Sequence, residues 1–323
     1  MSQRKAKART PPADSPDHAD LIARMRAGER RAIARAVTEL ERLSPVAPAL
    51  LRAMQPYLGH ALVIGFTGPP GAGKSTLLNA FTRHVRSEGK TVGIIAVDPS
   101  SPISGGAILG DRIRMSATVD DDGVFMRSLA SRGHLGGLCP AAVRVIDALD
   151  AAGKDLVLLE TVGTGQTDID VAEIADVRVV ISAPGLGDDI QAMKAGLLEI
   201  ADVLVVNKAD REGADRTVQQ LKGALSYRSG ERGKTPVLKT TATTGEGMVA
   251  LAEAIAAAAA AQTDRTAVAR RRRRARYLSA REAADLIAAR IRSGNAGALD
   301  RLTDAVLAGR LTPAAAARKV ISD

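Results

Sequence analysis

The sequence has 323 residues, enough for a full doubly wound domain with additional arms, and its formal net charge is +9. Aromatic residues make up 2% of the chain, Trp is absent, and there is a single Cys. This composition argues against a base-stacking reader of single-stranded nucleic acid, a disulfide scaffold or a Cys/His metal cage. No apolar run approaches the roughly 20 residues of a membrane span, and the N-terminus lacks the apolar core of a secretory signal, so we expect a cytoplasmic protein.

The positive charge is concentrated in two segments. Residues 1–10 carry four basic residues and residues 265–276 carry seven, with no acid in either segment. Removing +4 and +7 from +9 leaves −2 for the rest of the chain. We expect a nearly neutral body, a disordered basic tail over residues 1–16, and a solvated helix face at Arg270–Arg274 that is a candidate contact for a partner or a second subunit.

Residues 17–59 are predicted to form helices ahead of the main domain. Apolar side chains recur at helical spacing, charged residues fill the other face, and Gly28 divides the pattern in two. The apolar positions are Leu21, Ile22, Met25, Ile33, Val37, Leu40 and Leu43. After Pro45 and Pro48, a further helix is expected to end near Leu58.

Residues 60–262 alternate short apolar runs with helical patterns. The apolar runs are Ala61–Phe66, Thr91–Val97, Asp155–Leu159, Val177–Ile181, Val203–Val206 and Val237–Lys239. Helical patterns occur at Lys74–Glu88, Pro140–Ala152 and Thr217–Leu225. Continuous apolar runs are typical of strands covered on both faces, so the alternation predicts an α/β domain with a mostly parallel sheet flanked by helices.

Residues 263–323 are predicted to form a C-terminal helical arm. A basic helix is expected from about Asp264 to Arg292, followed by a break at Ser293–Gly297 and two short helices. Thr312 and Pro313 have the N-cap and N1 pattern of a helix start.

The strongest motif runs from Gly68 to Ser75 (GPPGAGKS) and matches the phosphate loop G-x-x-x-x-G-K-[ST]. It follows a predicted strand and opens a predicted helix, which is the context of a P-loop NTPase. Lys74 is expected to reach the β- and γ-phosphates, and Ser75 to bind Mg²⁺. The nucleotide-binding residues predicted here are Gly68, Gly71, Ala72, Gly73, Lys74, Ser75 and Thr76.

Asn207-Lys208-Ala209-Asp210 comes directly after a predicted strand, which places it on the ligand side of a parallel sheet. The Asp210 carboxylate can accept from N1–H and the N2 amine of guanine together, a donor pair that adenine lacks. We therefore predict GTP or GDP as the ligand, with Asn207, Lys208 and Asp210 in the base site. Thr241 and Ala242, after the next strand, are predicted to supply a second contact to the base.

Carboxylates near the phosphate loop are candidate Mg²⁺ ligands. Glu160 ends one strand and Asp98 another, and Asp111 lies in a Gly-rich segment. Together with Ser75 they are predicted to hold Mg²⁺ or orient the attacking water, with Lys74, Asp98 and Glu160 as the catalytic set. The Gly163 N–H is expected to sense the γ-phosphate, whereas Gln166 follows Gly163 by three positions and is a poor match to a water-positioning residue.

Three long strings point to a family: VDPSSPISGGAILGDRIRM (Val97–Met115), ETVGTGQ (Glu160–Gln166) and PGLGDDIQAMKAGLLEIADVLVVNKAD (Pro184–Asp210). They resemble the methylmalonyl-CoA-mutase-associated GTPases of the MeaB/ArgK type, within the SIMIBI class, over roughly residues 20–320. The resemblance implies a GTPase that escorts a coenzyme-B12-dependent acyl-CoA mutase, gates adenosylcobalamin loading and protects or reactivates the enzyme. It also implies a homodimer held through the C-terminal arm, and a switch in Gly185–Lys194 whose polar members are Asp188, Gln191 and Lys194.

Two other functions are compatible with a phosphate loop. A GTPase that delivers metal to another metalloenzyme would need a Cys/His-rich entry segment, which this sequence lacks. An NTPase associated with nucleic acid would use the Arg270–Arg274 run, but the aromatic residues are too few for base stacking and the body is close to neutral.

Overall fold

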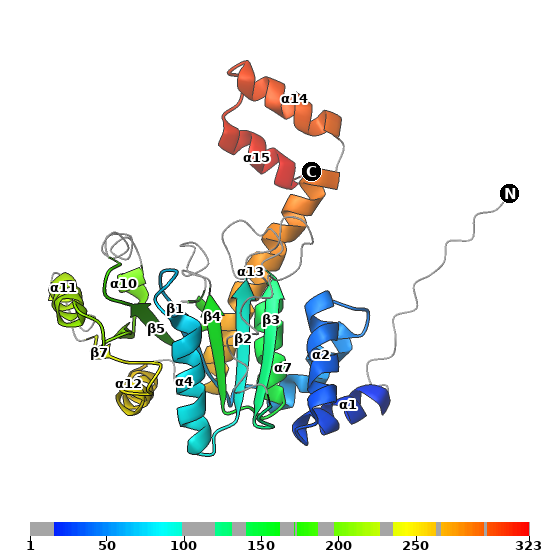
Figure 1. The fold of residues 1–323 in the computed structure, drawn as a ribbon. Helices are drawn as coiled ribbons and strands as arrows, with labels where there is room; N and C mark the ends of the chain where they lie inside the picture. The colour runs from blue at the N-terminus through cyan, green and yellow to red at the C-terminus, as the bar shows by residue number, and fades with distance from the viewer. Residues whose placement is uncertain are drawn as a thin grey trace. The chain divides into compact units, whose positions relative to one another are not determined.

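The protein forms an α/β fold around a seven-stranded sheet (Figure 1). The structure is a computed structural model, and it describes residues 16–98, 120–130, 140–161, 171, 173–186, 197–226, 235–262, 266–293 and 296–322. The chain divides into two compact units, the first ending at Arg274 and the second running from Ala275 to the C-terminus. In the described residues, no helix is long and apolar enough to cross a membrane.

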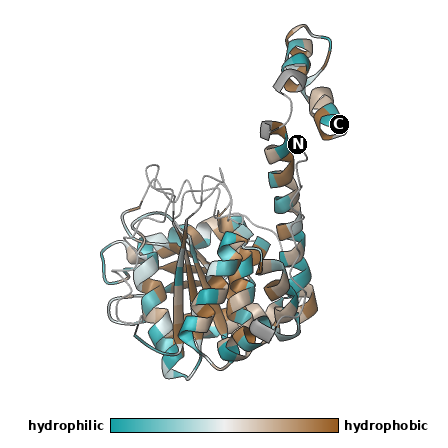
Figure 2. Cartoon of the chain, turned by 90° about the vertical axis from the view of Figure 1, so that its right-hand side faces the viewer, coloured by the Kyte–Doolittle hydropathy of each residue, from teal (hydrophilic) through white to brown (hydrophobic). Residues whose placement is uncertain are grey.

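All paired strands of the sheet are parallel, in the order β3-β2-β4-β1-β5-β6-β7. The strands are β1 (Leu62–Thr67), β2 (Val92–Asp98), β3 (Val124–Ala130), β4 (Leu156–Thr161), β5 (Val177–Ser182), β6 (Val203–Val206) and β7 (Val237–Lys239). Their side chains are mostly buried, and Figure 2 shows hydrophobic strands between the helices. Because β1 lies between β4 and β5, the chain runs outward from it in both directions, which opens a crevice at the carboxyl ends of these strands.

One strand, β3, was not expected from the sequence. Its residues (VFMRSLA) place Arg127 and Ser128 in the middle of the run, so no continuous apolar pattern marks it. The strand lies at the edge of the sheet, where Arg127 forms an ion pair with Glu41 of the N-terminal helices. An edge position tolerates polar side chains that a central strand would exclude.

Helices cover both faces of the sheet. The helices in the described part of the whole chain are α1 (Pro16–Arg26), α2 (Arg30–Arg42), α3 (Ala47–Met54), the 3-10 helix η1 (Gln55–Tyr57), α4 (Lys74–Ser87), α7 (Pro140–Ala151), α10 (Leu197–Ile200), α11 (Ala214–Ser226), α12 (Met248–Ala261), α13 (Ala267–Ser293), α14 (Ala296–Leu307) and α15 (Pro313–Ser322), of which α14 and α15 belong to the second unit. On one face α4 and α12 pack together in a core that includes Phe66, Phe81 and Leu251. On the other face α7 packs against β2 and β4, and α2 and α3 pack on α7.

The first residues of α13 attach it to the end of the sheet where β5 begins. Asp176, which is 1% exposed, accepts hydrogen bonds from Arg273 Nη2 at 2.7 Å and from Arg274 Nη2 at 3.1 Å. The Asp176 carboxylate also accepts from the Val63 amide at 2.9 Å. Arg274 is 2% exposed, so the expectation of a solvated face is wrong at this position. A buried carboxylate needs cationic partners, and the arginine run supplies them.

Candidate functional site

The phosphate loop connects β1 to α4 at the carboxyl edge of the sheet, and three of its glycines adopt backbone angles that favour glycine. Gly68, Gly71 and Gly73 have φ of 147°, 80° and 85°. A Cβ on Gly68 would lie 2.1 Å from the Ile181 carbonyl oxygen, and one on Gly73 would lie 2.5 Å from Asn207 Nδ2. Glycine is therefore needed at these positions for two reasons: the loop turns sharply, and Ile181 and Asn207 lie too close to it to leave space for a side chain.

Lys74 and Ser75 begin α4 and are both buried. Lys74 Nζ donates to the carbonyl oxygens of Gly68 at 2.9 Å and Pro69 at 3.1 Å, so the ammonium lies within the curve of the loop. Amides at the start of a helix carry partial positive charge, and an ammonium beside them adds to it. This arrangement suits a chain of phosphates.

Ser75 and Glu160 come together although 85 residues separate them in the sequence. Ser75 Oγ donates to Glu160 Oε1 at 2.7 Å, and Glu160 is 5% exposed at the end of β4. The parallel register pairs Glu160 with Phe66 of β1, which brings the end of β4 beside the start of the phosphate loop. A hydroxyl and a carboxylate are hard oxygen donors of the kind Mg²⁺ prefers, so these residues fit a magnesium ion whose other ligands are water and phosphate.

Asn207 joins three parts of the site. Its Nδ2 donates to the Ala72 carbonyl oxygen at 3.0 Å, which ties the residue to the phosphate loop. Its Oδ1 accepts from the Ala242 amide at 3.2 Å and from Thr240 Oγ1 at 3.3 Å. The side chain is 1% exposed and follows β6 directly, so it fixes the spacing between the phosphate loop and the loop after β7.

The remaining residues of the predicted base site surround Asn207. Lys208 has φ of 57°, and its Nζ donates to the Gly71 carbonyl oxygen at 2.6 Å. Thr241 and Ala242 are buried, whereas Asp210, three residues after Asn207, is exposed. The carboxylate of Asp210 is thus open to a ligand, while its neighbours shape the loop around it.

Several predicted site residues lie outside the described part of the structure. These are Asp111, Gly163, Gln166, Asp188, Gln191 and Lys194, and the side chain of Asp98 at the end of β2. Thr76 is described and is exposed on the first turn of α4. Among the described residues, no group of three or more His, Cys, Asp or Glu could hold a metal by itself. The sequence motifs contain Lys74, Ser75 and Asn207. The N-K-x-D pattern did not show that the Asn207 side chain connects the phosphate loop to the loop after β7.

Curated relatives match most of this chain. A protein of Pyrococcus horikoshii that is named as a GTPase is 50% identical over 240 residues, which cover 73% of this chain and 76% of the relative. The GTPase ArgK of Escherichia coli is 45% identical over 196 residues, 59% of each chain. A mouse protein named as a mitochondrial methylmalonic aciduria type A homologue is 36% identical over 193 residues, covering 58% of this chain and 46% of its own.

A solved structure and a family pattern agree with these relatives. The crystal structure of a LAO/AO transport system kinase is 27% identical, with a TM-score of 0.73, and the alignment covers 96% of this chain and 98% of that one. The family described as methylmalonyl-CoA mutase-associated GTPase MeaB matches residues 33–296. That range contains the phosphate loop, the Ser75–Glu160 pair and the Asn207 bridge, and the chain belongs to the MeaB family of methylmalonyl-CoA mutase-associated GTPases.

Proposed function

We propose that this GTPase binds GTP with Mg²⁺ and uses hydrolysis to control an adenosylcobalamin-dependent acyl-CoA mutase. The main support for the proposal is the hydrogen bond from Oγ of Ser75, the last residue of the phosphate loop, to Glu160 Oε1 at 2.7 Å. In a family of GTPases associated with a mutase, this pair is the natural place for the metal that neutralises phosphate charge.

The roles of the phosphate-site residues follow from their positions. Lys74 is proposed to exchange its bonds with the loop carbonyls for the β- and γ-phosphate oxygens, which carry greater negative charge. Ser75 would ligate Mg²⁺ directly, and Glu160 would act on the metal or on water in its shell. Bound Mg²⁺ would neutralise charge on the transferring phosphate. Asp98 and Asp111 are proposed as further carboxylates of this group.

Guanine is proposed to bind between the loops that follow β6 and β7. Asp210 would accept the N1–H and N2 amine of the base, while Asn207 holds the surrounding loops at the correct spacing. Lys208, Thr241 and Ala242 would line the base. Adenine would leave the carboxylate without a donor pair, which is the physical basis of the selectivity.

The nucleotide state is proposed to reach the mutase through a switch. Gly163 would sense the γ-phosphate, and the segment with Asp188, Gln191 and Lys194 would transmit the change to the partner. The chaperone activity would consist of gating adenosylcobalamin loading and protecting or reactivating the mutase. The C-terminal helices α13 to α15 are proposed to hold a homodimer, which light scattering tests directly.

The deciding experiment measures GTP hydrolysis with and without purified mutase apoenzyme. We expect the apoenzyme to form a complex and to raise the rate, because a partner can supply charge that stabilises the transition state of a slow GTPase. The Lys74→Ala variant serves as the control for contaminating hydrolysis. If the two proteins form no complex and the rate is unchanged, the proposed chaperone role is wrong, although the GTPase activity itself would stand.

A further inference from the structure

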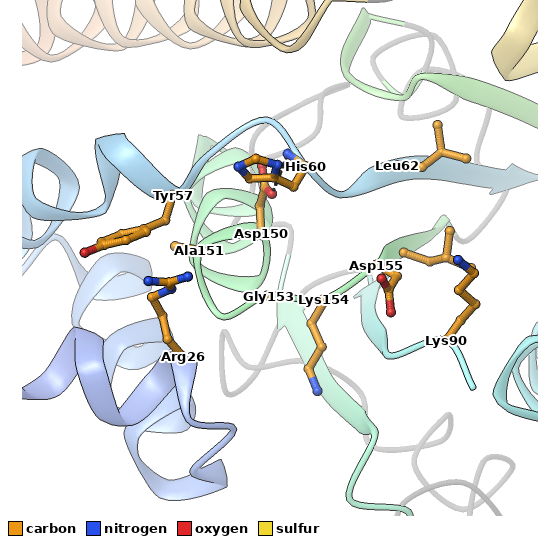
Figure 3. A pocket seen from close by; sticks show the side chains of 11 residues that line it. Arg26, Tyr57, His60, Leu62, Lys90, Asp150, Ala151, Gly153, Lys154 and Asp155 are labelled. Atoms are coloured by element: carbon orange, nitrogen blue, oxygen red, sulfur yellow. Dashed lines mark hydrogen bonds between the residues drawn. The ribbon is translucent and has the colours of Figure 1, made fainter.

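A cavity lies at the amino ends of the strands, whereas the phosphate loop lies at their carboxyl ends. It has a volume of about 530 Å³, and the first residues of β1 and β4, Leu62 and Leu156, border it. Figure 3 shows Leu62 together with the charged side chains that line the cavity. The phosphate loop follows the last residue of β1. A strand of six residues at about 3.3 Å per residue separates the two sites by roughly 17 Å. A ligand in this cavity would therefore not touch the nucleotide.

Three cations border the cavity: Arg26, Lys90 and Lys154. In the view of Figure 3, the side chain of Lys154 lies between those of Arg26 and Lys90. The Arg26 guanidinium lies 4.1 Å from the centre of the Tyr57 ring, which holds it at the rim. Among the described residues, none of the three cations forms an ion pair within 4 Å.

Lys154 is the unusual member because it is only 6% exposed. Within the described residues, its side chain makes one hydrogen bond, from Nζ to the Gly123 carbonyl oxygen at 3.2 Å. Burial lowers the pKa of Lys154, and the nearby positive charges of Arg86 and Arg30 lower it further, while Asp121 and Asp155 offset part of that effect. The ammonium is thus poorly compensated by its surroundings, and an added anion would stabilise its charged form.

The two carboxylates that border the cavity are already engaged elsewhere. The oxygens of Asp150 accept hydrogen bonds from the amides of Gly59, His60 and Ala61 at 2.6, 3.0 and 2.9 Å. Asp155 Oδ2 accepts from the Thr91 amide at 2.7 Å and from Thr91 Oγ1 at 2.9 Å. The charge of Asp155 still acts on Lys154, but within the described residues neither acid forms an ion pair with any of the three cations, whose N–H groups can therefore bind a more closely placed anion.

We propose that this cavity binds a small molecule with a doubly charged oxyanion group, either a phosphate ester or a dicarboxylate, through Lys154, Lys90 and Arg26. A cavity of this volume holds a metabolite-sized ligand. Lysine ammonium groups bind such anions as point charges, and the guanidinium adds planar donors. The site would make the protein responsive to an anionic metabolite independently of GTP.

The test uses the full chain saturated with Mg²⁺ and a non-hydrolysable GTP analogue, so that the phosphate loop is filled. Inorganic phosphate and malonate are titrated separately by calorimetry as probes of the two anion classes. We expect one equivalent of probe to bind. Tighter binding of phosphate would identify a phosphate-ester site, and tighter binding of malonate would identify a dicarboxylate site.

Variants show whether the cavity is the place of binding. Lys154→Met should weaken the preferred probe at least tenfold, and Lys154→Arg should retain most of the affinity because it keeps the charge. Lys222→Met removes the same charge from an exposed position on α11 and should change the affinity less than twofold. Lys90→Met, at an exposed position, should weaken binding about threefold and provides the test if Lys154→Met does not fold. No binding by the wild type, or equal binding by wild type and both methionine variants at the cavity, overturns the proposal.

Discussion

Charged residues have different partners at the two ends of the parallel strands, the carboxyl edge and the amino edge of the sheet. At the carboxyl edge, Lys74 and Lys208 donate to carbonyl oxygens of the phosphate loop. At the amino edge, Arg273 and Arg274 donate to the carboxylate of Asp176. A neutral carbonyl is a weaker partner for a cation than a carboxylate, so these particular hydrogen bonds at the carboxyl edge are more easily exchanged for hydrogen bonds to phosphate oxygens.

This difference explains why basic residues stabilise the fold at one edge and are suited to bind phosphate at the other. The Asp176 cluster attaches the start of α13 to β1 and β5, and Arg273 and Arg274 share its one buried carboxylate. Lys74 of the phosphate loop and Lys208 after β6 instead donate hydrogen bonds to neutral carbonyl oxygens of the loop itself. Substitutions at the amino edge should therefore change stability, and substitutions at the carboxyl edge should change nucleotide chemistry.

The largest effect is expected for Asp176→Ala. Removing this carboxylate leaves Arg273 and the buried Arg274 without their acidic partner, and uncompensated buried charge costs about 3–5 kcal/mol. Urea unfolding should show this loss. The control is Asp20→Ala, which removes an exposed pair with Arg24 and should cost at most about 1 kcal/mol. Equal effects of the two variants would contradict a structural role for the cluster.

Lys74→Ala should have the opposite signature. We expect GTP hydrolysis to fall about 100- to 1,000-fold, because a charge aimed at the transferring phosphate is lost. Thermal unfolding of the nucleotide-free protein should change less than in Asp176→Ala, since the hydrogen bonds from Lys74 to the carbonyl oxygens of Gly68 and Pro69 are to neutral acceptors. A variant that hydrolyses GTP normally would show that this lysine does not act on phosphate.

Asp210→Asn should change the base preference. The amide presents donors toward the N2 amine of guanine, so GTP affinity should fall at least about 30-fold, corresponding to about 2 kcal/mol for a mismatched polar group. Xanthosine triphosphate carries a carbonyl where guanine has that amine, and it should regain affinity in the variant. Nucleotide titration of wild type and variant measures both effects, and an unchanged guanine preference would refute the base assignment.

The smallest effect is expected for Asp147→Asn, near the amino-edge cluster. Burial raises the pKa of Asp147 from 3.8 to about 6, despite the opposing charge of Arg274. The folded protein therefore binds an extra proton between these values, so this group's contribution to stability falls as the pH rises from about 4 to 6. The variant should be more stable than wild type at pH 8 by about 1–2 kcal/mol, and no more stable at pH 3.5. Denaturant unfolding at the two pH values measures this, with the exposed Asp122→Asn as control.

Much of the fold and the phosphate site could be predicted from local sequence. Short continuous apolar runs identified six of the seven strands, because strands buried on both faces leave no room for polar side chains. The phosphate loop could be recognised because its glycines and its Lys-Ser pair are adjacent in sequence. The edge strand β3 escaped detection since Arg127 finds its partner in Glu41, a contact formed only in the folded chain.

The arginine run shows where local sequence reached its limit. The residue types of Arg270–Arg274 do not show whether the run faces solvent or a buried acid. Its acidic partner, Asp176, lies 97 residues from Arg273 in the sequence. The Ser75–Glu160 bond and the Asn207 bridge likewise depend on the register of parallel strands. The sequence alone determined six of the seven strands, the nucleotide motifs and the family, because these are local patterns of residue type. The tertiary structure decided which charges are neutralised and which are available, because that depends on residues brought together from distant parts of the chain.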